Sequence, residues 1–210
     1  PIFAATLAGV EAGMQVLDYC AGAGGKTLAL AAAMDNRGQI FAHDAEKQRL
    51  APIFDRLRRA AARNVQTVAG EAGLAPLRGR MDLVLVDAPC TGSGTWRRRP
   101  DAKWRLTARQ LEARIAEQAS ILDAAKAFVR PGGRLAYITC SIFSEENRRQ
   151  IEAFLSANGD FSPVEPQDLW RARFAGGGER VRLSGHGLVL SPAATGTDGF
   201  FFAALERGGA

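Results

Sequence analysis

The sequence predicts an α/β fold: a mostly parallel, Rossmann-like sheet of seven strands, with an antiparallel last strand and helices on both faces. Apolar runs of strand length alternate along the chain with segments of helical spacing. The run at 81–86, MDLVLV, is nearly continuously apolar, as a strand buried on both faces requires. A glycine-rich turn at 21–25 joins the first apolar run to the helix-forming segment LALAAAM. Strand, tight turn and helix are the opening unit of a doubly wound sheet.

The first half of the chain predicts three strand–helix units. Residues 2–12 suit a short helix, and the apolar run that stops at Asp18 predicts a strand over 14–19. Leu and Ala favour a helix over 25–35, and a turn at 36–38 leads to a strand over 39–43. An Arg-rich segment over 45–62 predicts a helix with a solvated face, and a third strand follows over 65–69.

The second half predicts the central strand 81–86, a polar loop and a long helix over 107–129 with apolar residues at helical spacing. Pro131-Gly132-Gly133 is expected to end that helix before a strand over 134–138. A helix over 144–158, with Ser144 as its candidate N-cap, and a short strand over 161–164 follow. Residues 167–186 predict a mobile loop, with Gly176-Gly177-Gly178 as its weakest point. The segments 187–192 and 199–205 should supply the antiparallel last strand.

Composition places the chain among single-domain globular proteins. Its 210 residues are 47% hydrophobic, enough for one domain, 1–210, with a full core. No apolar run reaches membrane-spanning length and no signal peptide precedes the first strand, so no membrane partner is expected. Three widely separated cysteines without a Cys-x-x-Cys pair argue against a disulfide framework and a zinc site. They favour a reducing, cytoplasmic compartment and no metal.

The chain is basic, with a net charge of +5 and a pI of about 9.6. This balance is compatible with a polyanionic partner, but an excess of this size also occurs on ordinary soluble surfaces. The chain begins at Pro1 rather than Met, so we expect it to be a piece of a longer protein.

The glycine turn allows three interpretations. A P-loop requires Gly-x-x-x-x-Gly-Lys-Thr, but its first glycine would fall at Cys20. A dinucleotide fingerprint requires Gly-x-Gly-x-x-Gly, but its third glycine is missing because Thr27 stands there. The remaining interpretation is a nucleoside-bearing cofactor without a pyrophosphate, such as S-adenosylmethionine. The expected contacts come from Cys20, Ala21, Gly22, Ala23, Gly24, Gly25 and Lys26.

Two acids follow later strands and suit the same cofactor. Asp44 stands about 20 residues past the glycine turn, where a carboxylate can accept hydrogen bonds from both ribose hydroxyls. It also precedes a helix, so an N-cap is the alternative, and both roles can coexist. Glu71 is a candidate for the adenine amino group, although a surface glutamate is equally compatible. Arg49, in the Arg-rich helix, is included among the expected cofactor contacts.

Reactive residues are expected at the carboxyl ends of strands one, four and five. Parallel strands in the usual order bring these ends into one crevice. They carry Lys26, Asp87, Cys90 and Cys140. A buried cysteine is ordinarily a small hydrophobic residue, but two thiols among polar residues favour a function. A nearby lysine or helix N-terminus would lower the pKa of such a thiol and so favour the nucleophilic thiolate.

The stretch 96–105 interleaves basic side chains with two tryptophans, which suits a partner that carries phosphates and stacking bases. The expected nucleic-acid contacts are Trp96, Arg97, Arg98, Arg99, Lys103, Trp104 and Arg105. The alternative is a loop whose tryptophans pack on the body of the protein.

Several blocks together resemble the Sun/RsmB-type RNA cytosine-5 methyltransferases. They are DYCAGAGGKT at 18–27, Asp44, DAPCTGSG at 87–94, Pro100-Asp101, TCS at 139–141 with EEN at 145–147, and GTDGFF at 196–201. The paired Pro-Cys and Thr-Cys-Ser blocks are the most specific of these. The first block departs from the family's usual Cys-Ala-Ala-Pro-Gly-Gly-Lys-Thr, because Gly22-Ala23 replace Ala-Pro. The family's N-terminal RNA-binding region is expected to be missing or truncated.

The resemblance implies a methyltransferase catalytic domain that binds S-adenosylmethionine and methylates cytosine in RNA, with the base splayed out of its stack. Cys140 thiolate would add to carbon 6 of the base and activate carbon 5. Asp87 would hydrogen-bond the pyrimidine edge, Lys26 would contribute positive charge, and Cys90 would assist release. In DNA cytosine-5 methyltransferases the Pro-Cys thiol is the nucleophile, so Cys90 and Cys140 would exchange importance if the chain followed them.

Ribosomal RNA is the expected substrate, ahead of transfer RNA, and the chain is expected to act as a monomer. The main rival is a non-catalytic RNA-binding or assembly module with a decayed methyltransferase fold, which has no use for two thiols, Asp87 and Lys26. A nicotinamide oxidoreductase is disfavoured by the absent third glycine. A methyltransferase of small molecules or proteins leaves the 96–105 stretch unexplained.

Overall fold

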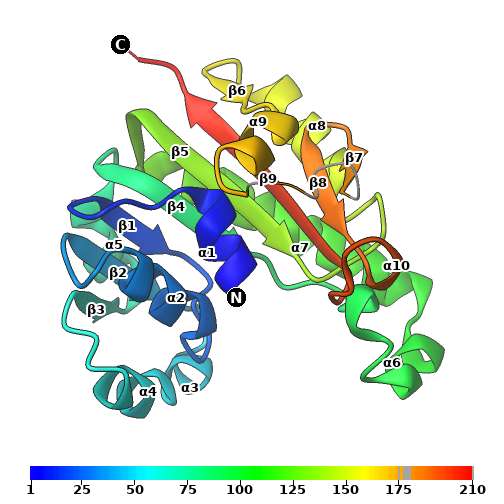
Figure 1. Cartoon of the computed structure of the whole chain (residues 1–210), viewed down its shortest axis with the longest axis horizontal. Helices are drawn as coiled ribbons and strands as arrows, with labels where there is room; N and C mark the ends of the chain where they lie inside the picture. The colour runs from blue at the N-terminus through cyan, green and yellow to red at the C-terminus, as the bar shows by residue number, and fades with distance from the viewer. Residues whose placement is uncertain (175, 177–180, 210) are drawn as a thin grey trace. The chain divides into compact units, whose positions relative to one another are not determined.

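The protein divides into two compact units in a computed structural model that describes residues 1–174, 176 and 181–209 (Figure 1). The first unit consists of residues 1–87, 125–136 and 207–210, and the second of residues 88–124 and 137–206. None of the helices in the described part is both long and apolar enough to cross a membrane.

The first unit contains a parallel sheet built around β4 (Met81–Asp87), whose apolar side chains are buried. The strands β3 (Val65–Val68), β2 (Gln39–His43), β1 (Gln15–Asp18), β4 and β5 (Val129–Thr139) follow one another in this order. The pairs β1–β2, β1–β4 and β2–β3 are parallel, with Asp18 opposite Leu85. The predicted parallel core, with the first strand beside the fourth, is therefore confirmed.

Helices of the first unit begin and end close to their expected positions at the glycine turn and differ further along. The helical segments are α1 (Ile2–Ala8), α2 (Gly25–Ala33), α3 (Lys47–Leu50), α4 (Ile53–Arg59), α5 (Gly70–Leu74), and the 3₁₀ turns η1 (Ala75–Leu77) and η3 (Lys126–Phe128). The single helix expected over 45–62 is two helices, because Pro52 has no N–H to donate to the carbonyl of Gln48. α5 was not expected, since glycine at positions 70 and 73 disfavours a helix.

Strand β5 is longer than predicted, and its residues belong to both units. The long helix ends at Ala125, and the strand already begins at Val129, before the Pro-Gly-Gly segment that was expected to separate them. The proline lies near the start of the strand, where a missing donor is tolerated. Gly133 lies so close to β4 that an added Cβ would be 2.8 Å from the carbonyl oxygen of Met81. The Pro-Gly-Gly segment therefore does not break the strand, and Gly133 marks a close approach to β4.

The second unit combines helices with an antiparallel hairpin. Its helical segments are η2 (Ser93–Thr95), α6 (Pro100–Arg105), α7 (Ala108–Ala125), α8 (Arg148–Ala157), α9 (Pro166–Arg171) and α10 (Pro192–Thr195). Strands β5, β9 (Phe200–Arg207), β8 (Gly187–Leu190) and β7 (Arg182–Ser184) follow in this order, and β6 (Phe161–Pro163) pairs with β9. β7–β8 and β8–β9 are antiparallel, which confirms the predicted antiparallel edge.

The described residues form nine strands where seven were expected. β7 is one of the unexpected ones, and together with α9 it occupies the ends of the segment expected as a loop over 167–186. Residues 177–180, with two of the three glycines expected to be its weakest point, lie outside the described residues. Pro166 at the first helical position was the sequence signal for α9.

Candidate active site

The glycine turn of the first unit is held between the ends of β1 and β2. The Ala21 N–H donates to the carbonyl oxygen of His43 at 2.8 Å, and the Gly24 N–H donates to Ala21 at 2.9 Å. Gly22 and Gly24 have φ values of 50° and 81°, in the left-handed region that glycine adopts without strain. A Cβ on Gly24 would collide with the side chain of Ile53, which packs in a small core beneath the turn. The sequence therefore needs glycine at position 24 twice over.

We expect Gly24→Ala to weaken cofactor binding by on the order of tenfold and to destabilise the protein by about 1–3 kcal/mol, because the turn must shift to relieve the clash. Titration calorimetry with S-adenosylmethionine and urea unfolding measure the two effects. Gly79→Ala is the matched control, since Gly79 also has positive φ, at 65°, but an added Cβ would meet nothing within 4 Å. Unchanged cofactor affinity in Gly24→Ala would contradict this assignment of the turn.

Asp44 fastens the same turn and is itself buried. Its Oδ2 accepts a hydrogen bond from the Gly22 N–H at 2.9 Å, and its Oδ1 accepts one from the Glu46 N–H at 3.0 Å. Arg49 Nη1 lies 3.9 Å from Oδ1. The alternative interpretation of Asp44 as an N-cap is wrong, because the N-cap of α3 is Glu46 and Asp44 instead closes a turn two residues before the helix. Each of its oxygens retains lone-pair capacity for a ribose hydroxyl.

Lys26 and Asp87, both expected at the reaction site, form an ion pair of 2.5 Å between Nζ and Oδ2. Lys26 is in the first turn of α2, and Asp87 is the last residue of β4. Asp87 keeps 35% of its side chain exposed, so a substrate can reach it. The pair leaves little net charge at this position and fixes the direction in which the carboxylate points.

Asp18 is a site residue for which the sequence analysis made no prediction. Its side chain is fully buried, Oδ2 accepts a hydrogen bond from Thr27 Oγ1 at 2.6 Å, and Oδ1 has no partner. Burial raises its pKa to about 7, against which the Thr27 hydrogen bond acts only partly. An acid that closes a buried strand just before the glycine turn was the available signal.

We expect stability to fall as the pH rises from about 4 to about 7, because folded Asp18 retains a proton that the unfolded chain loses above its ordinary pKa of 3.8. Asp18→Asn should remove this part of the pH dependence. Urea unfolding of the wild-type and the variant at a series of pH values within that window measures it. Identical pH trends in both proteins would contradict the raised pKa.

The remaining expected cofactor contacts behave differently. Burial raises the pKa of the Cys20 thiol, and the nearby carboxylates of Asp18, Asp44 and Asp87 raise it further, so Cys20 stays protonated and is no candidate nucleophile. Glu71 lies in α5 and pairs with Arg78 at 2.6 Å. Its expected contact with adenine stays a prediction.

In the second unit, the Sγ atoms of Cys90 and Cys140 lie 3.3 Å apart, and neither cysteine is in a disulfide. The hydrogen bond to Cys140 is the largest cause that raises the pKa of Cys90 far above its ordinary range, and burial adds to it. Cys90 therefore stays protonated, and its S–H can donate to Cys140. A donor at this distance favours the thiolate of the accepting sulfur, the form in which a cysteine acts as a nucleophile.

A pocket of about 430 Å³ opens beside Cys90, in the size range of small-ligand sites. Thr91 and residues of α6 and α7 form its other walls: Ala102, Arg105, Leu106, Gln110, Ala113, Arg114 and Glu117. The two arginines are paired with carboxylates, Arg105 with Asp101 and Arg114 with Glu117. Of the two neighbouring thiols, Cys90 lines this pocket.

The basic stretch 96–105 was expected as a loop, but its second half forms α6. Pro100 at the first helical position, Asp101 in the first turn, and Lys103 and Arg105 in the last turn were the overlooked signals. Trp104 is 82% exposed. Lys103 Nζ lies 5.4 Å from the centre of its ring. The ring of Trp104 is therefore largely exposed to solvent, with the Lys103 ammonium over it.

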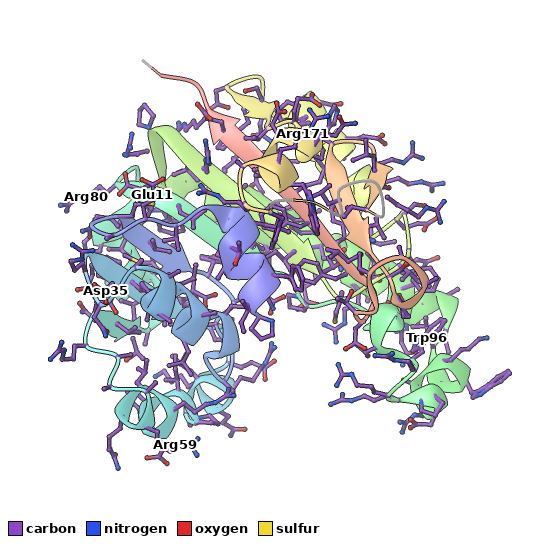
Figure 2. The ribbon with its side chains drawn as sticks, in the orientation of Figure 1. Glu11, Asp35, Arg59, Arg80, Trp96 and Arg171 are labelled. Carbon is purple, nitrogen blue, oxygen red and sulfur yellow. The ribbon has the colours of Figure 1, made fainter. Side chains whose placement is uncertain are left out.

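Trp96 follows the alternative interpretation, since it packs edge-on against Phe143 with ring centres 5.8 Å apart. Figure 2 shows it in the segment that leads into α6. Arg97 and Arg98 form ion pairs with Asp198 at 3.5 and 2.6 Å. Arg99 is exposed. The contacts of this stretch with nucleic acid stay a prediction.

The described part of the chain contains no cluster of three or more His, Cys, Asp or Glu side chains that could hold a metal ion.

Comparison with known proteins decides the family. A family model described as 16S rRNA methyltransferase RsmB/F matches residues 4–206. The chain belongs to this family. Ribosomal RNA small subunit methyltransferase B of Erwinia tasmaniensis is 36% identical over 199 residues, which are 93% of this chain and 42% of that protein. The protein of the same name from Escherichia coli gives the same identity and coverage. The chain thus spans less than half the length of these curated relatives.

Solved structures agree with the RsmB/F assignment. NSun6 from Pyrococcus horikoshii, crystallised with SFG, matches with a TM-score of 0.83 and 28% identity, over 98% of this chain and 51% of that chain. The family's cofactor is S-adenosylmethionine, and SFG is its analogue. The first unit fits this cofactor, because Asp18 Oδ1 is a buried polar atom without a partner among the described residues and the carboxylate of Asp44 adjoins the glycine turn. Acidic side chains also suit a ligand that carries a sulfonium charge.

Proposed function

We propose that this RsmB/F family member is an S-adenosylmethionine-dependent cytosine-5 methyltransferase of ribosomal RNA that works through a covalent Cys140–cytosine adduct. The observation that carries the proposal is the pair of thiols whose sulfur atoms lie 3.3 Å apart. The relatives named as small-subunit ribosomal RNA methyltransferases support ribosomal RNA as the substrate, ahead of transfer RNA.

The cofactor side of the reaction is assigned to the first unit. S-adenosylmethionine supplies the methyl group when bound. The turn over residues 20–26 and Asp44 would hold its nucleoside, and Asp18 would add a buried polar group. Lys26 orients Asp87, whose carboxylate hydrogen-bonds the pyrimidine edge and stabilises the charge that develops on the ring.

The nucleophile is assigned to Cys140. Its thiolate forms a bond to carbon 6 of the cytosine, and the displaced electron pair makes carbon 5 nucleophilic enough to accept the methyl group. Cys90 would favour this step, because its raised pKa keeps it protonated and its S–H can donate to the Cys140 sulfur 3.3 Å away. A cysteine nucleophile whose thiolate accepts a hydrogen bond from a second thiol can be activated without a neighbouring histidine.

The release step follows from the same coupling. When Cys140 sulfur is bonded to carbon it is no longer an anionic acceptor, so the largest cause that holds the proton on Cys90 is gone. Cys90 can then lose that proton to solvent and take the proton from carbon 5. The bond from Cys140 to carbon 6 breaks, and Cys140 leaves as a thiolate. One proton is released to solvent for each methyl group transferred.

The RNA side is assigned to the stretch 96–105 and the pocket beside Cys90. Trp104 offers a flat, exposed surface for a base. The arginines of α6 and the segment before it offer charge to phosphates. The pocket of about 430 Å³ gives a flipped pyrimidine a path to the thiols.

The proposal is tested by incubating the chain with methyl-labelled S-adenosylmethionine and deproteinised small-subunit ribosomal RNA, with transfer RNA in a parallel reaction. Nucleoside mass spectrometry should detect label in 5-methylcytidine from the ribosomal RNA. Label in another nucleoside, or in transfer RNA alone, contradicts the assignment of base or substrate. Failure to bind S-adenosylmethionine in a calorimetric titration would favour the non-catalytic module.

A further inference from the structure

We propose that the adjacent residues Glu146 and Asn147 are positioning residues, and that each holds one of the two cysteine loops in register for its own step of the reaction. This inference rests on the proposed roles of Cys140 in addition and of Cys90 in release. Neither residue was assigned a role from the sequence, where polar residues ahead of a helix are ordinary.

Glu146 is completely buried and grips the loop that carries Cys90. Its Oε1 accepts the backbone N–H of Thr91 at 2.8 Å, and its Oε2 accepts the Thr91 hydroxyl at 2.6 Å. Gln118 of α7, also completely buried, donates to Oε1 at 3.0 Å and to the carbonyl oxygen of Pro89 at 2.9 Å. The residues on both sides of Cys90 are therefore tied to one carboxylate.

Asn147 is 2% exposed and grips the loop that carries Cys140. Its Oδ1 accepts the Thr139 hydroxyl at 2.5 Å, and its Nδ2 donates to the carbonyl oxygen of Ser141 at 2.9 Å. These two contacts bracket Cys140 in the way that the contacts of Glu146 bracket Cys90.

The hydrogen bonds of Glu146 and Asn147 to the two loops start from the same point of the chain. The hydroxyl of Tyr137, inside β5, donates to the backbone carbonyl oxygen of Glu146 at 2.7 Å. Consecutive residues thus hold both loops, and they act together with the direct contacts between the loops, in which the Gly94 N–H donates to the Cys140 carbonyl oxygen and the hydroxyls of Ser93 and Ser141 lie 2.9 Å apart. A buried carboxylate is expensive unless several donors converge on it, so its position here is closely determined.

The two residues should affect different steps. Glu146→Ala frees the Cys90 loop, so addition and methyl transfer proceed but proton removal slows, and a covalent protein–RNA adduct should accumulate. Asn147→Ala frees the Cys140 loop, so addition itself slows and no adduct should accumulate. Misplacement of a reacting group by about 1 Å costs on the order of a hundredfold, so we expect losses of tenfold to a hundredfold in each step.

A conservative variant separates position from charge. Glu146→Gln keeps an oxygen for the Thr91 N–H and for Gln118, and its amide can donate to the Thr91 hydroxyl. We expect its release rate to stay within about threefold of the wild-type rate, since each hydrogen bond has a substitute. Thr91→Val, which removes only the hydroxyl contact, should accumulate adduct to a smaller extent and tests the same grip if Glu146→Ala does not fold.

The experiment is a single-turnover reaction of the whole chain with labelled S-adenosylmethionine and small-subunit ribosomal RNA. It records methyl transfer to RNA and the fraction of protein in a detergent-resistant adduct, alongside the melting temperature of each variant. Asn158→Ala is the control, since it removes a buried side-chain hydrogen bond to the carbonyl oxygen of Phe154 in the same unit. It should lower the melting temperature without changing the ratio of adduct to product.

Two outcomes overturn the inference while leaving the proposed function intact. One is Glu146→Ala that releases RNA at the wild-type rate. The other is that Glu146→Ala and Asn147→Ala each slow methyl transfer and RNA release by the same factor, as a purely structural role requires. A wild-type chain that methylates no cytosine, or an active Cys140→Ala variant, overturns the proposed function instead.

Discussion

Replacement of Cys140 by alanine is expected to lower methyl transfer to RNA by on the order of 10⁴-fold, because the variant has no sulfur to add to carbon 6 of the cytosine. No other thiol can take its place: burial keeps Cys20 protonated, and the raised pKa of Cys90 keeps that thiol protonated as well. The measurement is incorporation of labelled methyl groups into ribosomal RNA under single-turnover conditions.

Binding of S-adenosylmethionine is the internal control for this variant. The residues expected to hold the cofactor belong to the first unit, so calorimetric affinity should match that of the wild-type protein. An inactive variant that still binds the cofactor identifies a chemical loss rather than a folding loss. A Cys140→Ala protein that methylates RNA at the wild-type rate would falsify the nucleophile assignment.

Replacement of Cys90 by alanine should have a different result. Methylated RNA should form but stay covalently bound to the protein, whereas Cys140→Ala should form none. Cys140 can still add and the methyl group can still be transferred, but no sulfur remains 3.3 Å away to take the proton from carbon 5. Release should fall by on the order of 10²- to 10⁴-fold, the usual contribution of a positioned base. The adduct should appear as a slower-migrating, detergent-resistant band that ribonuclease shortens.

The Cys90→Ala variant also shows which of the two cysteines is the nucleophile and which assists release. If the chain followed the DNA cytosine-5 methyltransferases, Cys90→Ala would be inactive without an adduct, and Cys140→Ala would retain activity. Because Cys90 also helps to ionise Cys140, the Cys90→Ala protein should need a higher pH for adduct formation than the wild-type protein. A pH profile of the adduct yield measures this second effect.

The sequence predicted the parallel part of the fold well because its signals are local. The apolar run of β4 and the strand–turn–helix at residues 15–33 identify themselves without neighbours. β5 was predicted too short because Pro131-Gly132-Gly133 is typical of a break, and only the close approach of Gly133 to Met81 shows otherwise. That contact joins residues far apart in the chain and leaves no local pattern.

For the candidate site, the sequence indicated which reactive residues would meet but not the buried polar contacts that hold them. Residue types and strand order indicated that Cys90 and Cys140 would meet, and the structure brings them together. The burial of Asp18, Glu146 and Asn147 could not be predicted, because polar residues near turns are usually solvated. Their partners are contributed by distant segments, so the sequence contains the donors and acceptors but not their pairing. The meeting of the thiols with the cofactor residues stays a prediction.

The ion pairs of Asp198 with Arg97 and Arg98 have a consequence for how RNA would bind. Phosphate affinity ordinarily depends on ionic strength in proportion to the cations that displace condensed counterions. Here the protein already supplies a counterion to two of those cations, and a phosphate must compete with it. If RNA binds this stretch as proposed, its affinity should fall less steeply with salt than the number of basic residues suggests, and a larger share of the affinity should come from stacking, which salt does not screen.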